Sequence, residues 1–195
     1  MKGKGLTIEM IVDTALQLVE EKGYGNFSVR ELALRMDVKA ASLYNHVNGV
    51  EDINREVGKL AASRLNGSLA RAVEGKTRDE AVMALAYAYR GFVKENQELY
   101  KAIIGMPVLD QGDGTIEVGR ESMLAIRNVV CQYQIQDEEN VHFSRCFRSA
   151  LHGFALLEAA GYFTGKNIHS EESFRFLVKG YADWLHRLEE QEIRG

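Results

Sequence analysis

The sequence has little of what several protein classes require. It contains one proline and two cysteines, Cys131 and Cys146, among 195 residues. Two cysteines without a Cys-x-x-Cys spacing are too few for a disulfide framework, and we expect both to be small buried apolar side chains. No apolar run approaches the ~18 residues that span a bilayer, and the N-terminus lacks the apolar stretch of a secretory signal. These absences predict a cytoplasmic protein with no membrane partner.

An excess of positive charge is also missing. The net charge is −4, and residues 1–64 carry nine basic and nine acidic side chains. Because phosphate contacts supply much of the affinity of a protein for DNA, this composition gives no support to nucleic-acid binding. A DNA-binding function must therefore rest on a motif.

No segment shows the sustained alternation of apolar and polar residues that marks a β-strand. Apolar residues instead recur at steps of three and four, which predicts an all-α fold of about nine helices. Thr7 should cap the first helix, which ends near Gly23 and Gly25. A long fourth helix is expected over about residues 50–73.

Residues 28–47 predict two short helices joined by a tight turn. Ser28 and Glu31 form a capping box, in which the glutamate reaches back to the serine N–H. Asp37 stands at the sharp turn, where aspartate tolerates a left-handed backbone. The second helix is expected to run from about Lys39 to Val47. Two helices joined in this way form a helix-turn-helix, whose second helix enters the major groove of DNA.

Few residues suggest a metal site, a catalytic site or a cofactor site. Glu139 and His142 have the Glu-x-x-His spacing of di-iron bundles, but the chain offers no second pair, so we predict no metal site. No set of residues forms a defensible catalytic group, and the loop expected at residues 108–115 lacks phosphate-binding spacing, so no cofactor is predicted. An all-helical enzyme or cofactor carrier and a protein-binding helical adaptor remain as alternatives to DNA binding.

Three segments together carry a family resemblance: ALQLVEEKG at residues 15–23, SVRELA at 28–33 and LYNHV at 43–47. With the long fourth helix, they resemble the TetR (tetracycline repressor) family of bacterial transcriptional regulators over about residues 6–65. Beyond that the likeness is one of architecture. RSALHGFALLEAAGYF, residues 148–163, resembles the penultimate helix of a subgroup that has a His-Gly pair there.

The resemblance implies an N-terminal three-helix helix-turn-helix head at residues 1–50. Residues 51–195 would form the linker helix and a C-terminal helical bundle that binds an effector and dimerises. The chain would then be a repressor that binds a palindromic double-stranded operator as a homodimer and is released by a small molecule. The dimer would form through the last two helices, so that a charge at Ala155 would be expected to split it.

The resemblance carries individual DNA contacts over only in the head. Arg30 matches an arginine that reaches a base or a phosphate, and Tyr44 and His46 match residues that contact phosphates. The groove-facing positions of the recognition helix match Lys39, Ala40, Ser42 and Asn45. Simpler readings remain open, because Tyr44 and His46 could pack against the first helix and Arg30 could be an ordinary solvated charge.

Two further expectations concern charge and the effector. Many relatives have a lysine at the start of the fourth helix, where this chain has Val50 followed by two acids that would repel DNA.

The C-terminal part is rich in aromatic residues and methionines, which could form an ordinary core or line an apolar pocket. The pocket would bind a small apolar effector, and its candidate residues are Tyr89, Phe92, Met106, Met123, Phe147 and His152.

Overall fold

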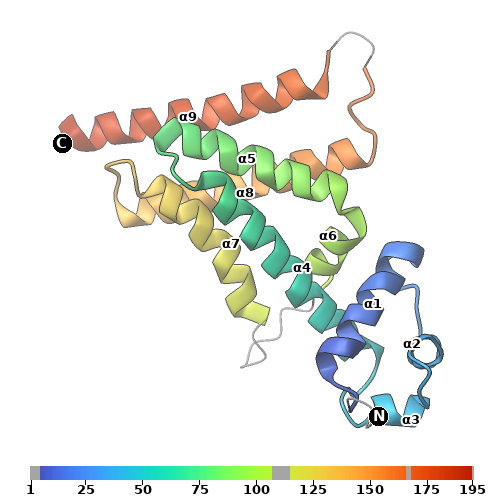
Figure 1. The fold of residues 1–195 in the computed structure, drawn as a ribbon. Coiled ribbons are helices and arrows are strands. Elements are labelled where there is room, and N and C mark those ends of the chain that lie inside the picture. The colour runs from blue at the N-terminus through green and yellow to red at the C-terminus, as the bar shows by residue number, and fades with distance from the viewer. Residues whose placement is uncertain (1–4, 107–114, 166–167, 195) are drawn as a thin grey trace. The chain divides into compact units, whose positions relative to one another are not determined.

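A computed structural model describes residues 5–106, 115–165 and 168–194, without the side chains of 115–120. Within these ranges the chain has nine helices and no strand, which confirms the all-α prediction (Figure 1). None of the helices in this part of the chain is long and apolar enough to cross a membrane. Residues 108–114 of the expected loop lie outside the described residues. The helices are α1 Ile8–Lys22, α2 Val29–Arg35, α3 Ala40–Leu43, α4 Val50–Val73, α5 Arg78–Glu95, α6 Gln97–Ile104, α7 Thr115–Val130, α8 Asp137–Ala159 and α9 Ser170–Arg194.

These helices form two compact units. Unit 1 comprises residues 1–63 and 96–118, and unit 2 comprises residues 64–95 and 119–195. The long helix α4 therefore contributes its first half to unit 1 and its second half to unit 2. The division of the chain at residue 50 into a head and a C-terminal domain stays a prediction.

The predicted caps of the first two helices are present in unit 1. Thr7 Oγ accepts a hydrogen bond from the Met10 N–H at 3.4 Å, and Ser28 Oγ accepts one from the Glu31 N–H at 3.2 Å. Only half of the capping box forms, because the Glu31 carboxylate pairs with Lys22 of α1 instead of reaching back. Asp37 has a φ of 54°, as expected for the turn between α2 and α3.

The core of unit 1 is completed by α6. Leu99 and Ala102 of α6 are buried in the same apolar cluster as the inner faces of α1, α2 and α4. The Glu98 carboxylate accepts a hydrogen bond from the Tyr24 N–H at 2.8 Å, just after α1. A Cβ at Gly58 of α4 would lie 2.8 Å from the Ala102 carbonyl oxygen. Glycine is therefore required at this close approach of α4 and α6.

In unit 2 a single arginine joins three helices. Arg90 of α5 is 8% exposed, and its Nε and Nη2 atoms donate to the Glu158 carboxylate of α8 at 2.7 and 2.6 Å. Its Nη1 atom donates to Glu171 of α9. The guanidinium carbon also lies 4.7 Å from the centre of the Phe174 ring. The hydrogen bonds that Arg90 donates to the Glu158 carboxylate raise the pKa of Arg90 above its ordinary value, so the side chain stays charged.

A second arginine ties the start of α5 to the end of α9. Arg78 Nη2 donates to Glu189 at 2.6 Å, and the Gln134 N–H donates to the same carboxylate at 2.8 Å. The Arg78 side chain, followed by the Gln134 amide, lowers the pKa of Glu189 to about 2 from an ordinary 4.5. A carboxylate with a lowered pKa stabilises the fold above its unfolded-state pKa, and this stability is lost as the pH falls through the folded value.

We therefore expect Glu189→Gln to destabilise unit 2 at neutral pH, where the wild-type carboxylate is charged. The difference should shrink as the pH falls from about 4.5 towards 2, because the wild-type side chain then becomes protonated. Urea unfolding followed by circular dichroism at several pH values measures it. Glu190→Gln is the matched control, since among the described residues Glu190 pairs only with Arg194, and both side chains are exposed. Wild-type and Glu189→Gln stabilities that stay equally far apart across this range would contradict the assignment.

The two cysteines differ from expectation. Both are free and exposed, so the prediction that they are buried is wrong. Cys131 follows the last residue of α7, and Cys146 lies on the outer face of α8. Helical spacing places a residue on a face, but which face a neighbouring helix covers depends on the tertiary fold.

Candidate nucleic-acid interface

The helix-turn-helix is formed by α2 and α3 of unit 1. The second helix is shorter than predicted: α3 ends at Leu43, and the next three residues form turns. One α-type hydrogen bond persists, from the Val47 N–H to the Leu43 carbonyl at 3.1 Å. Lys39 precedes the helix without a side-chain cap. The prediction of a helix through Val47 is therefore wrong in length, although Leu43 and Val47 are both buried in the core as expected.

The predicted contact residues lie on the outer side of this segment. Tyr44 is 57% exposed, and Asn45 and His46 are exposed as well. Tyr44 and His46 are thus not buried against α1. Arg30 and Lys39 are also exposed, whereas Ala40 and Ser42 are half-buried. The structure places all seven residues on α2, on α3, at the residue just before α3 and in the turn that follows α3.

Ion pairing separates two kinds of basic side chain near α2. Arg35 Nη1 donates to Glu21 of α1 at 2.5 Å, and Lys22 pairs with Glu31. Arg30 and Lys39, in contrast, have no ion-pair partner among the residues that the structure describes. Their charges are therefore available to a polyanion, although the net charge of the chain is negative.

Asp52, the second of the two acids at the start of α4, opposes DNA binding less than the sequence suggests, because its charge is partnered within the chain. The Asp52 carboxylate accepts hydrogen bonds from the Asn48 N–H at 2.9 Å and the Asn48 side-chain amide at 2.6 Å, and it pairs with Arg55. The Asn48 N–H is the main cause of a lowered pKa for Asp52. This carboxylate caps the helix and is balanced by Arg55. The helical i, i+3 spacing of the two residues could have revealed the pair.

A groove runs between α2 and α3, and sequence reasoning missed one residue in it. Its volume is about 740 Å³, and its lining includes Arg30, Leu34, Lys39 and Ala40. Leu34 is 81% exposed. The signal was present in the pattern, because Leu34 lies off the apolar stripe of α2 that the spacing predicts to be buried.

The predicted effector residues do not fall in one unit. Tyr89, Phe92 and Phe147 are buried in unit 2, where the Phe147 ring lies 4.9 Å from that of Tyr181. Met106 belongs to unit 1 and would contact a Cβ at Gly58. Met123 and His152 are half-buried. Burial, with a smaller effect from Arg148, lowers the pKa of His152. A common pocket for these residues stays a prediction.

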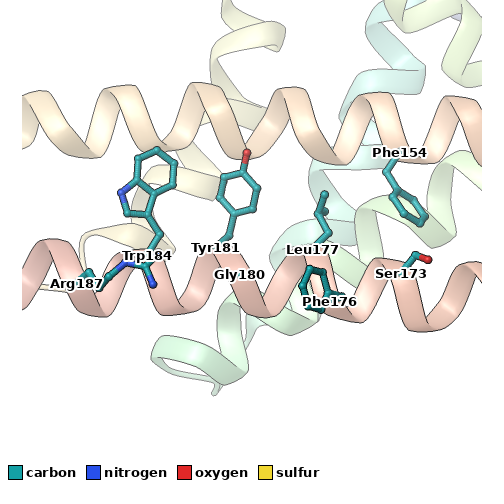
Figure 2. A pocket seen from close by; sticks show the side chains of 8 residues that line it. All are labelled: Phe154, Ser173, Phe176, Leu177, Gly180, Tyr181, Trp184 and Arg187. Atoms are coloured by element: carbon teal, nitrogen blue, oxygen red, sulfur yellow. The ribbon is translucent and has the colours of Figure 1, made fainter.

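A separate groove lies on the surface of α8 and α9 in unit 2 (Figure 2). Its volume is about 450 Å³, and Phe176 beside it is 82% exposed. In Figure 2, Tyr181 and Trp184 point from α9 towards α8. The full lining is Phe154, Ser173, Phe176, Leu177, Gly180, Tyr181, Trp184 and Arg187.

The residues of these two surfaces have the chemistry of binding sites. Within the described ranges, no group of three or more histidine, cysteine or acidic side chains could hold a metal ion. The head offers unpaired cations beside small and polar side chains, and unit 2 offers an exposed apolar groove. This combination suits recognition of an anionic partner by unit 1 and of an apolar surface by unit 2.

Comparison with known proteins gives matches along most of the chain. Residues 11–57 match the family model described as bacterial regulatory proteins, tetR family, and residues 82–181 match the tetracyclin repressor-like C-terminal domain. The uncharacterized HTH-type transcriptional regulator YobS of Bacillus subtilis is 31% identical over 183 residues, which are 93% of each chain. Rv0681 of Mycobacterium tuberculosis, described in the same words, is 32% identical over 156 residues, 80% of this chain and 72% of that protein.

The fold is also found among solved structures. The crystal structure of a TetR variant from Acinetobacter baumannii AYE in complex with minocycline has a TM-score of 0.68. The match covers 94% of this chain and 98% of that one at 17% identity. At this identity the likeness is one of fold.

Proposed function

The chain belongs to the TetR family of HTH-type transcriptional regulators, and from this we propose that it represses genes by binding a palindromic operator until a small molecule releases it. Its family and both relatives are transcriptional regulators, not enzymes. The observation that carries the proposal is the pair of unpartnered cations, Arg30 and Lys39, beside the exposed face of α3. Assignment to the subgroup with a His-Gly pair stays a prediction. We place the protein in the cytoplasm, where operator DNA is accessible.

The residues of the interface divide into two roles. Phosphate contacts fix the position of a protein on DNA, and contacts with base edges supply sequence specificity. Tyr44, His46 and Lys39 have the chemistry to hold phosphates. Ser42, Asn45 and Arg30 would contact base edges, and Ala40 can offer only an apolar contact.

This division can be tested with two substitutions. Tyr44→Phe removes a hydroxyl that would hold a phosphate, so it should weaken binding to all operator variants alike. Asn45→Ala should instead relax preference at particular base pairs by roughly 1–3 kcal/mol each. Selection of bound fragments from genomic DNA, followed by titration of single-base variants, measures both effects.

Tyr162→Phe serves as the control, since Tyr162 is 75% exposed and lies in unit 2. It should bind like the wild type at every site. Unchanged affinity and preference in both head variants would mean that α3 and the following turn do not enter the groove.

Two features of α8 and α9 support a homodimer. The exposed Phe176 and its groove present apolar surface, and large exposed apolar patches mark interaction sites. Gly153 and Gly180 lie within helices where glycine costs ~1 kcal/mol relative to alanine. A Cβ at either position would meet nothing within 4 Å in this chain. A second copy that approaches closely would explain both glycines, and its head would have to reach a major groove about 34–36 Å away.

Release by an effector would act through unit 2 and the long helix α4. The minocycline complex shows that one protein of this fold binds a small molecule. Buried aromatic residues such as Tyr89 and Phe147 supply apolar surface in unit 2, and α4 runs without a break from unit 1 into unit 2. An effector that prefers one position of α4 would change operator affinity by its differential affinity, typically ~1–3 kcal/mol.

A further inference from the structure

We propose that Leu34 is a specificity residue that contacts the 5-methyl group of a thymine in the major groove. This inference rests on the proposed function, because it assigns a base to part of the same DNA-binding face. It adds an apolar contact from α2 to the polar contacts that the recognition helix would make.

The first observation is the exposure of Leu34. The other apolar residues of α2, Val29, Leu32 and Ala33, are buried in the core of unit 1, while Leu34 is 81% exposed. A single exposed leucine is ordinary on a protein surface, so its exposure alone assigns nothing. The residues that line the groove beside Leu34 indicate what it could contact.

The second observation is the position of Leu34 among the DNA-facing residues. Arg30 lies four residues earlier on α2, and residues at this spacing share one face of a helix. Both line the groove that continues to Lys39 and Ala40 at the start of α3. The leucine thus lines the same groove as two cations that have no ion-pair partner in the described part of the chain.

The third step is the chemistry of the possible partner. A leucine side chain has no hydrogen-bond donor or acceptor, so it cannot bind a phosphate or the polar edge of a base. Thymine is the only base of unmodified DNA that presents a methyl group in the major groove. The flanking positive charges favour a polyanion over an apolar protein surface. An apolar side chain beside Arg30 and Lys39 therefore fits a thymine whose neighbouring base or phosphates contact the cations.

Replacement of thymine by deoxyuridine tests this contact directly, because it removes the methyl group and keeps the base pair. An operator selected by the wild-type protein is synthesised with deoxyuridine at one thymine position at a time. At one position in each half-site the wild type should bind about fourfold more weakly, as expected for the loss of one methyl-sized apolar contact. Leu34→Ala removes this contact from both subunits of the dimer, so it should bind the thymine operator about sixteenfold more weakly. It should also no longer distinguish the two bases at that position.

Two further variants keep the result interpretable. Leu34→Met retains an apolar side chain and should keep most of the discrimination. Leu124→Ala, at a leucine of α7 that is 50% exposed, should discriminate like the wild type. Circular dichroism of each variant confirms that the exposed substitutions leave the fold intact.

The outcomes separate this inference from the proposed function. If the wild type binds operator DNA but Leu34→Ala keeps the full difference between thymine and uracil at every position, Leu34 does not contact a methyl group. An equal loss on both operators would also overturn the inference, since it would show a general positioning role. If the wild type selects no DNA at all, the proposed function fails first and the thymine contact fails with it.

Discussion

Phe176→Asp should convert the protein to a monomer and weaken operator binding by about 100-fold or more, the gain that linking two binding modules supplies. Phe176 is 82% exposed beside the groove of α8 and α9, and a Cβ added at Gly180 on the same helix would meet no heavy atom of the chain within 4 Å. A carboxylate at this position would be buried without a partner in a dimer but remain hydrated in a monomer. Sedimentation velocity and operator titration measure the two effects.

Leu124→Asp is the control, because it adds the same charge at a half-exposed leucine outside α8 and α9 and should leave the dimer intact. Ala155→Glu, which the sequence suggests as a probe of the interface, is unsuitable. Ala155 is 3% exposed within its own chain, so the substitution would damage the core of unit 2. A wild-type protein that is monomeric at micromolar concentration, or a dimeric Phe176→Asp, would contradict the interface.

Arg90→Ala should lower the free energy of unfolding by about 3–5 kcal/mol, as expected when one partner of a buried ion pair is removed. The Arg90 and Glu158 side chains are 10% and 15% exposed, so the substitution leaves a carboxylate buried without its cation. Glu171 is 59% exposed and can be hydrated instead. Since domains are stable by only about 5–15 kcal/mol, urea unfolding should show a large shift in midpoint.

A double variant separates the effect of leaving the Glu158 charge unpaired from the effect of losing the packing of the Arg90 side chain. Replacing both Arg90 and Glu158 by methionine removes the two charges together, and such apolar replacements of buried pairs are often close to neutral. Most of the stability should therefore return in the double variant. Arg194→Ala breaks an exposed pair with Glu190 and should change little. If Arg90→Ala is as mild as Arg194→Ala, Arg90 does not hold the three helices together.

Local signals in the sequence predicted much of the fold. The cap at Thr7, half of the box at Ser28 and the left-handed turn at Asp37 all depend on residues within a few positions of one another. The bounds of α4 were also predicted, because Asn48 and Gly49 interrupt the chain just before it. Short-range capping and turn preferences act before any tertiary contact forms, so they can be read without one.

The ion pairs of unit 2 could not be predicted in the same way. Helix α5 begins at Arg78 with a φ of 49°, which is unfavourable for a non-glycine residue. Contacts with Gln132 and Glu189, far along the chain, hold Arg78 in this conformation. No pattern in the sequence near Arg78 predicts these long-range contacts. The same limit applies to the exposed cysteines, whose surroundings are set by how the helices pack.

The place of α6 in the core of unit 1 limits how the DNA-binding head can be exchanged during evolution. Leu99 and Ala102 close a core that otherwise comes from the first 61 residues of the chain. A recombination that joined the first half of α4 to another regulator would separate this head from the surface that covers it. The Glu98 contact with the Tyr24 N–H and the glycine contact at Gly58 would be lost together. The head and α6 must therefore change as a matched pair, although all of α5 separates them in the gene.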